Sequence, residues 1–464
     1  MTRLDIAEQV VELVRAQAGP SAEAEVVADH TTLALTRFAN SFIHQNVADS
    51  TTTVRLRLHL DGRTATGSTT VTAAEGLKDL VARTVAASKL TPRDPLWPGL
   101  AEPEPIKRAP SSDPDTQNAS PDDRAARVRA FVDAAGGLET AGYCRTIYSA
   151  GAFANSAGQG VAGRAAEAAM DGIARNAGAD GVARLASGRL ADVDGAALGA
   201  RAAAKARAGG RPIELPPGRY EVVLEPEAVA DLLANLATFG FNGRAYARQQ
   251  SFAEPGAQQF DPAVTVTDEP SAVLPFDTEG TPRAPLTVVA AGTTAAVTHD
   301  RSSAAEVGAA STGHASPSSR SWGPIATHLH LTPGAAIPPA ASPGAATPPA
   351  ASPGATAPSA LPLVAGVERG LLITDLWYTR VLDQKSLVIT GLTRNGVWLI
   401  EDGEVTAAVS NMRFTQSYPE ALGPGAVRGI GAESVRLPDR WSGVQYTAPA
   451  LHLAAWNLTG NASG

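Results

Sequence analysis

The chain has one cysteine, Cys144, among its 464 residues. A single cysteine excludes an internal disulfide and every metal site built on a Cys-x-x-Cys pair. A lone cysteine in a chain of this size usually packs as a small hydrophobic residue, so we expect Cys144 to be buried and unreactive. Whatever chemistry the protein performs must come from other side chains.

The sequence also lacks a long hydrophobic run and an excess of positive charge. No segment approaches the roughly 20 apolar residues of a membrane-spanning helix. The first 19 residues have no apolar signal core, and they instead place Leu4, Val10 and Val14 on one face of a helix. The net charge is −8, which does not favour a nucleic-acid surface. We therefore expect a cytoplasmic protein that binds neither membrane nor nucleic acid.

Two catalytic motifs are missing. None of the eight histidines is followed by glutamate, so the chain contains no HExxH or HExxxH zinc helix, and it has no GxSxG nucleophile elbow. A Ser-His-Asp triad remains open, because its members can lie far apart in sequence. Gly158, Gly160 and Gly163 match GxGxxG, but the residues after them have little apolar content. This match predicts a glycine-rich turn, not a dinucleotide site.

Composition and periodicity divide the chain into segments. Residues 1–100 predict an N-terminal α+β domain, in which Val54, Leu56 and Leu58 alternate with polar residues along a strand. Asp61-Gly62 then predicts a two-residue hairpin turn, followed by a second strand and by a helix over 73–88. Residues 101–120 are rich in Pro, Ser and Asp and predict a linker.

The rest of the chain has a different pattern. Residues 121–215 predict a middle α/β segment, which starts with Ser120 as a helix cap and Pro121 at the first helical position. Residues 216–464 contain many short strands with glycine turns and predict a β-rich antiparallel C-terminal domain. Within it, 333–360 repeats Pro, Ala, Gly and Ser with a ten-residue period and predicts an insertion without a packed core. The whole chain is therefore expected to have an α+β fold.

The polar loops of the C-terminal part hold the candidate site residues. The loop 276–283 combines two carboxylates and a guanidinium, which either line a cleft or satisfy one another within the loop. His328 and His330 share one face of a strand, but no Asp, Glu or Cys lies close by in sequence, so we expect structural roles for them. The candidates for lining a substrate chamber are Asp277, Glu279, Arg283, His299, Asp300, Arg301 and His314.

Several blocks of the sequence resemble the TldD/PmbA (TldE) family of bacterial and archaeal metallopeptidase subunits. RFAN and IHQN near the N-terminus and ANSAG in the middle match its signatures. FDTEGTPR, THDRSSA, STGHA, TDLWYTR, TGLTRNGVWLIEDGE and NMRFT follow in the family's order. The resemblance covers most of the chain except the insertion, and it also accounts for the GxGxxG match.

The resemblance implies a heterodimer of two similar subunits that enclose a proteolytic chamber. In the TldD-like subunit, an HExxxH helix supplies two histidine ligands for zinc and a catalytic glutamate. The corresponding positions here are 234–239, with the sequence Ala-Asn-Leu-Ala-Thr-Phe, which offers neither those ligands nor a general base. The chain is therefore similar to the PmbA/TldE side of the family, with no cofactor of its own and zinc expected in the partner.

These observations favour a non-catalytic subunit that pairs with a TldD-like HExxxH-bearing subunit and helps to hold an extended peptide in proteolysis or peptide maturation. Two alternatives remain open. The first is a stand-alone hydrolase of the metallopeptidase family, which peptide cleavage by the chain alone would support. The second is a homodimeric peptide-binding protein without protease activity, which a genome lacking any HExxxH-bearing relative would support.

Overall fold

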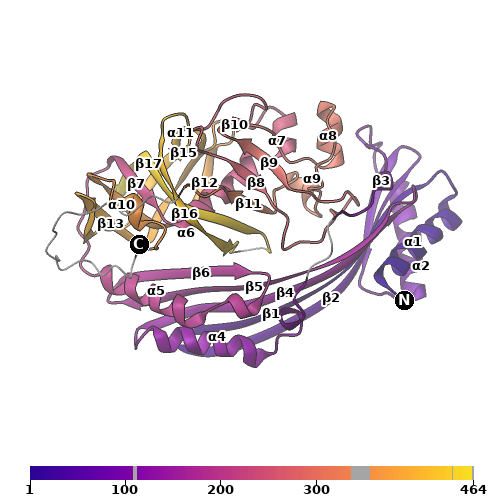
Figure 1. The fold of residues 1–464 in the computed structure, drawn as a ribbon. Coiled ribbons are helices and arrows are strands. Elements are labelled where there is room, and N and C mark those ends of the chain that lie inside the picture. Colours follow the sequence, from indigo (N-terminus) through magenta and orange to yellow (C-terminus); the bar gives the residue numbers. More distant parts are fainter. Residues whose placement is uncertain (108–111, 336–355, 441–442, 462–464) are drawn as a thin grey trace.

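The computed structural model describes residues 1–107, 112–335, 356–440 and 443–461. Its strands form a six-stranded sheet from the first half of the chain and an 11-stranded sheet from the second half, with helices packed on both (Figure 1). The predicted α+β class is confirmed. No helix within these residues has the length and apolar character needed to cross a membrane.

The six-stranded sheet is antiparallel throughout, in the order β3-β2-β1-β4-β5-β6. Its strands are β1 (Glu23–Ala39), β2 (Phe42–Leu60), β3 (Arg63–Thr69), β4 (Glu139–Asn155), β5 (Gly160–Asn176) and β6 (Ala179–Ser187). The segments 1–100 and 121–215 contribute to the same sheet, because β1 pairs with β4.

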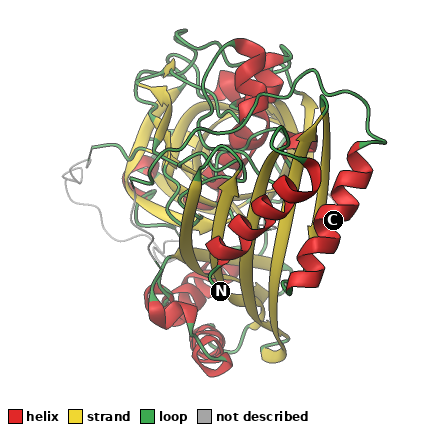
Figure 2. Cartoon of the chain, turned by 90° about the vertical axis from the view of Figure 1, so that its right-hand side faces the viewer, coloured by secondary structure: helices red, strands yellow, loops and turns green. Residues whose placement is uncertain are grey.

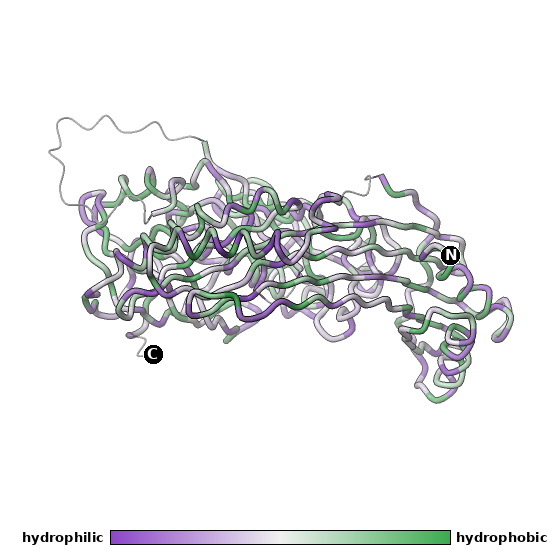
Figure 3. The backbone as a smooth tube through the Cα atoms, turned by 90° about the horizontal axis from the view of Figure 1, so that it is seen from below, coloured by the Kyte–Doolittle hydropathy of each residue, from purple (hydrophilic) through white to green (hydrophobic). Residues whose placement is uncertain are grey.

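Helices cover this sheet at its two ends. At one end, α1 (Arg3–Ala18) and α2 (Ala74–Ser88) lie across the strands, and Figure 2 views the molecule from that end. At the other end lie α4 (Pro121–Ala134) and α5 (Gly195–Ala208) (Figure 1). The short helix α3 (Pro114–Gln117) and the 3-10 helix η1 (Leu190–Asp192) lie in the connections. Each end has its own apolar cluster of buried residues. Figure 3 views the sheet from below and shows hydrophilic and hydrophobic residues intermixed along its long strands.

Local sequence signals explain the elements of the first half. Val54, Leu56 and Leu58 are buried, as their alternation predicts. Asp61 and Gly62 both have positive φ, at 53° and 71°, which the tight turn between β2 and β3 requires. Ser120 forms a capping box at the start of α4, where Pro121 is the first helical residue. These local predictions are confirmed.

Three other sequence features have simple structural explanations. Gly158 lies in the turn between β4 and β5 with a φ of 97°, while Gly160 and Gly163 lie in β5, so the GxGxxG match is a turn and not a nucleotide loop. Cys144 is fully buried, and burial raises the pKa of its thiol to about 12. Of the insertion at 333–360, residues 336–355 lie outside the part of the chain that the structure describes.

The second sheet has the order β10-β9-β8-β11-β17-β15-β13-β12-β7, with β14 beside β13 and β16 beside β17. An additional β17–β7 pairing joins β7, β12, β13, β15 and β17 into a closed ring. The strands are β7 (Gly218–Leu224), β8 (Val266–Asp268), β9 (Leu286–Ala290), β10 (Thr293–Thr294), β11 (His328–Leu331), β12 (Arg369–Asp383), β13 (Val388–Glu401), β14 (Glu404–Ala408), β15 (Met412–Ser417), β16 (Val427–Pro438) and β17 (Gln445–Asn461). Most pairs are antiparallel, as predicted, but β11–β17 and β7–β12 are parallel.

The helix α6 (Pro226–Asn235) packs against β12 and β17 and continues as the π-helix η2 (Leu236–Gly240). Val229, Leu232 and Leu233 are buried in the largest apolar cluster, as their helical spacing predicts. The remaining helices of this half are short: α7 (Gly243–Ala247), α8 (Arg301–Val307), α9 (Ser319–Trp322), α10 (Leu361–Val364) and α11 (Tyr418–Ala421).

Buried polar contacts fix the two halves against each other. Arg184 on β6 donates two hydrogen bonds to Asp375 on β12, over 3.1 and 2.8 Å. Gln159, in the turn between β4 and β5, donates to the carbonyl oxygen of Gly280 over 2.9 Å. Because charged and amide groups buried in this way must keep their partners, the first contact holds β12 against β6 and the second holds the loop 276–283 against the first sheet.

Candidate functional site

A cleft of about 530 Å³ lies between the β2–β3 end of the first sheet and the loops of the second half. Its walls combine arginines, carboxylates, hydroxyl groups and one tryptophan, contributed by separate segments between residues 25 and 320. The residues most relevant to its chemistry are Glu25, Arg55, Arg57, Asp94, Trp97, Arg244, Arg248, Thr278, Glu279, Asp300, Glu306, Ser319 and Arg320. Of the predicted site residues, only Glu279 and Asp300 line this cleft.

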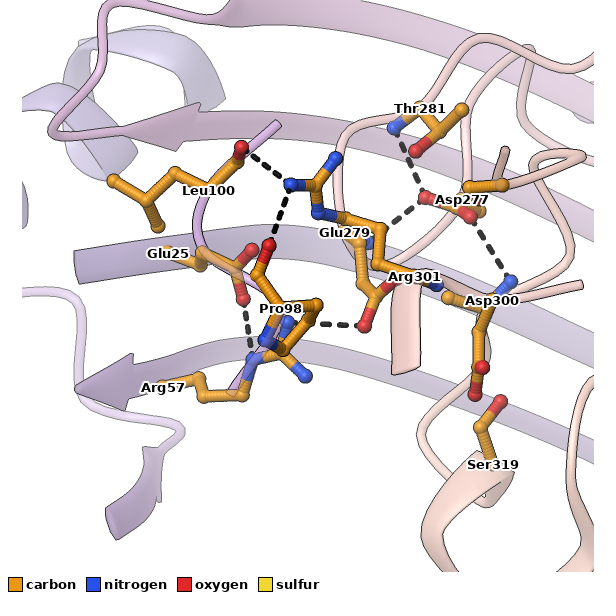
Figure 4. A network of polar contacts seen from close by, with 12 residues as sticks. Glu25, Arg57, Pro98, Leu100, Asp277, Glu279, Thr281, Asp300, Arg301 and Ser319 are labelled. Carbon is orange, nitrogen blue, oxygen red and sulfur yellow. Dashed lines mark hydrogen bonds and ion pairs between the residues drawn. The ribbon is translucent and has the colours of Figure 1, made fainter. Parts of the chain in front are cut away.

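Arg57 is at the centre of the charged wall (Figure 4). It extends from β2, pairs with Glu25 on β1, and places its Nη2 atom 3.0 Å from Oε1 of Glu279. Its guanidinium also lies 4.9 Å from the ring centroid of Trp97, in cation–π contact. One arginine therefore connects two strands of the first sheet to a loop of the second half.

Burial and charge set the protonation of this group. Burial raises the pKa of Glu25 to about 7, although Arg57 opposes the shift. Burial also disfavours the charge on Arg57, but Glu25 and Glu279 outweigh it and raise the pKa of the guanidinium. Glu25 therefore exchanges its proton near neutral pH while Arg57 stays charged beside Glu279.

The loop 276–283 is organised by Asp277. Its Oδ1 atom accepts from the backbone N–H groups of Glu279 and Thr281, over 2.9 and 3.0 Å, and its Oδ2 atom accepts from that of Ala315 over 2.9 Å. Burial, together with the neighbouring Glu279, raises the pKa of Asp277 to about 7. Asp277 thus shapes the loop, and it presents Glu279 and Thr278 to the cleft.

Arg283 does not form the ion pair considered from sequence. Its Nε atom donates to the carbonyl oxygen of Phe276 over 3.3 Å, and its Nη1 atom is buried without a hydrogen-bond partner. Glu279 pairs with Arg57 instead, because that side chain approaches from the first sheet. The loop is therefore satisfied partly from outside, and burial lowers the pKa of Arg283.

The segment 299–301 begins α8 and ties down a distant part of the chain. Asp300 caps the helix by accepting from the N–H of Ser303 over 2.7 Å. The backbone N–H of Arg301 donates to Oε2 of Glu279 over 2.8 Å. Its guanidinium donates to three successive carbonyl oxygens, those of Pro98, Gly99 and Leu100, over 3.2, 3.4 and 2.6 Å (Figure 4). Arg301 therefore positions residues 98–100, which we call the strap, beside Trp97.

The predicted histidines serve internal contacts. His299 is buried with its Nδ1 atom 3.1 Å from the hydroxyl of Ser303, and burial lowers its pKa. His314 is buried with its Nε2 atom 2.9 Å from Oδ2 of Asp268. Although burial opposes the charge, hydrogen bonds from His314 and from the backbone of His328 lower the pKa of Asp268. Neither histidine lines the cleft, and both form hydrogen bonds within the protein that surrounds it.

His328 and His330 do not converge on a common ligand. The two ring nitrogens of His328 lie 2.7 Å from the hydroxyls of Ser271 and Thr447, and burial lowers its pKa to about 4. His330 lies 3.9 Å from a carboxylate oxygen of Glu269. Among the described residues, no group of three or more His, Cys, Asp and Glu side chains is arranged to hold a metal ion.

The segment 234–239, where the resemblance leads us to expect a zinc motif, carries packing residues and one amide side chain. Leu236 and Ala237 are fully buried in the apolar core, and Asn235 donates to Oδ2 of Asp231 over 3.2 Å. Asp231 and Asn235 line a second, smaller cavity of about 210 Å³. The segment 234–239 has no imidazole or carboxylate, so these residues do not fit a catalytic zinc.

Sequence reasoning missed Glu25, Arg57, Trp97 and the arginines of α7 and α9. Arg55 and Arg57 occupy the polar face of an alternating strand, a pattern that also describes a solvent-exposed face. Their partial burial was the missing information, because it results from the second half of the chain covering that face. No local pattern reports such a contact.

Comparisons with known proteins match the fold. Residues 217–460 match the family model described as the PmbA/TldA metallopeptidase C-terminal domain. A TldE structure from Thermococcus kodakarensis superposes with a TM-score of 0.82 at 17% identity, over 98% of this chain and 100% of that one. A proposed modulator of a DNA gyrase from Thermotoga maritima gives a TM-score of 0.81 at 16% identity, over 99% and 100%. A proposed modulator of DNA gyrase from Bacteroides thetaiotaomicron gives 0.77 at 18% identity, over 98% of each chain. No curated protein sequence matches the chain.

Proposed function

Since the chain belongs to the PmbA/TldD metallopeptidase family, whose C-terminal model matches more than half of it, we propose that it is the non-catalytic subunit of a two-subunit zinc metallopeptidase in the cytoplasm. Its partner would be a TldD-like subunit that carries HExxxH, and zinc would reside in that partner. The observation that carries this proposal is the chemistry of α6 and η2, where the resemblance aligns Ala234 and Phe239 with the two histidine ligands and Asn235 with the general base.

The contribution of this chain would be to hold the peptide substrate. The cleft is lined by loops and by charged side chains of both signs, and it lies between the two halves of the chain. Arg301 and Asp277 fix the strap and the loop that form its walls, so the cleft is largely preformed. An extended peptide suits such a site, since its amide groups can bond with loop backbone and hydroxyls while side chains meet the charges.

The test compares the purified chain, its HExxxH-bearing relative and the mixture of both. We would measure zinc content by atomic emission and cleavage of a library of unstructured fluorogenic peptides. The proposal predicts no stoichiometric zinc and no cleavage for this chain alone, and cleavage in the mixture that exceeds the relative alone. Chelator-sensitive cleavage by this chain alone would overturn the proposal and favour a stand-alone hydrolase.

A further inference from the structure

One stretch of the first sheet has no neighbouring strand on its outer side. β2 pairs with β1 from Phe42 to His59, but with β3 only from Val54 to Leu60. The outer edge of residues 42–53 therefore lacks a strand partner within the described chain. Residues 44–51 are exposed without interruption, so this stretch is open on its faces as well as on its edge. Regular strand geometry is maintained here by β1 alone.

The opposite edge of the same sheet is treated differently. There β6 contacts β13 and β16 of the second half, and α5 packs over it. At the near end, β3 covers β2 from Val54 onward. The bare edge is thus confined to one continuous segment of 12 residues, 42–53, and does not result from a general lack of cover on the sheet.

Apart from one bulge, this edge lacks most of the features that keep edge strands from pairing with other chains. Residues 42–53 contain no lysine, no proline and no glycine, and Asp49 is the one charged residue apart from any protonation of His44. Threonine, valine and isoleucine, which favour strands, are frequent in it. The register with β1 shifts between Arg37, which pairs with Gln45, and Phe38, which pairs with Ile43, so His44 forms a bulge near the start of the stretch and residues 45–53 pair regularly. A long and regular edge of this kind is a template for another strand.

Exposed apolar side chains accompany the edge. Phe42 is 57% exposed, and Val47 is 37% exposed. Leu33 on β1, which pairs with Asp49, is 36% exposed and lies on the same face of the sheet as Val47. A strand added to β2 would cover the unpaired backbone groups and, with the residues that follow it, this small apolar surface.

We propose that residues 43–53 pair, strand to strand, with the corresponding edge of the HExxxH-bearing subunit. This inference rests on the proposed function. A chain of the same fold has an edge of matching length, whereas a short substrate peptide would leave part of it bare. The edge ends at Thr53, and Arg55, two residues further on, lines the cleft. A subunit bound here lies beside the cleft, where its catalytic groups must be to reach a peptide held in it.

The variant that tests the pairing is Ala48→Lys, which places a charge at the middle of the edge. Ala48 is already exposed in the folded chain, so the substitution disturbs no core packing. Val47→Lys does the same on the other face. Ala432→Lys is the matched control, because Ala432 is also an exposed alanine in a strand, β16, of the other half. Circular dichroism verifies that each variant is folded.

Two measurements on the full-length chains decide the matter: the dissociation constant of the mixture by analytical ultracentrifugation, and amide hydrogen exchange across 43–53. We expect complex formation to slow exchange of these amides at least about tenfold. Ala48→Lys and Val47→Lys should weaken the complex about 100-fold, and Ala432→Lys should not. Unchanged exchange at 43–53 in the complex, or wild-type affinity of both edge variants, would overturn the pairing. Protection of the edge by self-association of this chain alone would overturn the choice of partner.

The two proposals fail in different ways. A complex that protects 43–53 but cleaves no peptide would leave the strand pairing intact and refute the peptidase role. Enhanced cleavage by a complex in which 43–53 exchanges freely would support the peptidase role and refute the strand pairing. The exchange experiment reports on the edge directly and does not depend on activity.

Discussion

The guanidinium of Arg57 lies 3.0 Å from the carboxylate of Glu279, across 222 residues of sequence and across the junction of the two halves. Both side chains are largely buried, with 21% and 6% of their surfaces exposed. A hydrogen bond between charged groups in such a place contributes more than a surface ion pair, and loss of one partner leaves the other poorly solvated. This pair therefore couples the stability of the cleft to the docking of the two halves.

We expect Glu279→Ala to lower the free energy of unfolding by about 2 kcal/mol. Urea denaturation followed by circular dichroism measures the change. The control is Glu306→Ala, which removes a carboxylate from the same cleft at an exposed position of α8 and should alter stability by less than about 0.5 kcal/mol. Equal effects of the two substitutions would show that the Arg57 pair makes no special contribution.

Glu25 gives this region a pH dependence. Its pKa is raised to about 7 in the folded chain, so the folded state binds a proton that the unfolded state releases above about pH 4.5. The stabilisation from Glu25 is therefore complete below that pH and is lost as the pH rises toward 7.

We expect Glu25→Gln, which cannot ionise, to remove this loss. The difference in unfolding free energy between variant and wild type should shift in favour of the variant by on the order of 1 kcal/mol per pH unit between pH 5 and 7. Urea denaturation at several pH values measures the slope. The exposed Glu12→Gln is the control, and a slope no different from that control would contradict the assignment.

The sequence was sufficient for those features that depend on neighbours in the chain. The alternation at Val54 and Leu58, the positive φ of Asp61 and the cap at Ser120 all follow from local chemistry. The parallel pairing of β7 with β12 joins segments about 150 residues apart and has no such signal. Periodicity identifies a strand but does not identify its neighbour.

The candidate site likewise combines features that the sequence predicts with contacts that it does not. The composition of residues 276–283 predicts a polar loop, but it does not predict which side chains from other parts of the chain pair with that loop. Arg57 was predicted to lie on the outer face of a strand, because a polar residue at that period is normally solvated. His314, which we expected among the residues of the chamber wall, is buried with its Nε2 atom 2.9 Å from Asp268, 46 residues earlier in the chain. Side chains at such separations meet only through tertiary packing.

Arg301 should control the order of the strap at 98–100. We expect Arg301→Ala to release this segment, since three carbonyl oxygens lose their donor, and to increase amide exchange at Trp97, Gly99 and Leu100 at least about tenfold. Arg301→Lys should not restore protection, because one ammonium cannot reproduce the planar set of donors. Hydrogen exchange with mass spectrometry measures both. Retained protection in the alanine variant would mean that packing alone holds the strap.

Asp375 should be among the most sensitive positions of the chain. It is fully buried and accepts hydrogen bonds from Arg184, Arg440 and Asn395, and although burial opposes its charge, the two arginines lower its pKa to about 2. Asp375→Asn would remove the carboxylate that pairs with Arg440 and leave Arg184 with Asp171 alone, so we expect a loss of about 3–5 kcal/mol. Because the folded pKa is depressed, the contribution of Asp375 is present above about pH 4 and is lost as the pH falls through 2. Acid and urea denaturation measure both effects, and a loss below 1 kcal/mol would contradict the expectation.

Removal of metal should affect cleavage by the mixture of the two subunits but not the stability of this chain. A chelator should abolish cleavage by the mixture but leave the thermal midpoint of this chain unchanged, because no group of three or more His, Cys, Asp and Glu side chains in the described part of the chain is arranged to hold a metal ion. His328→Gln combined with His330→Gln provides the sharper version, since these two share a strand and are the pair best spaced for chelation. We expect the double variant, once shown to be folded, to support cleavage in the mixture within about twofold of wild type, as both nitrogens of His328 already have hydroxyl partners. A large loss of cleavage together with a loss of bound zinc from this subunit would place the metal here instead of in the partner.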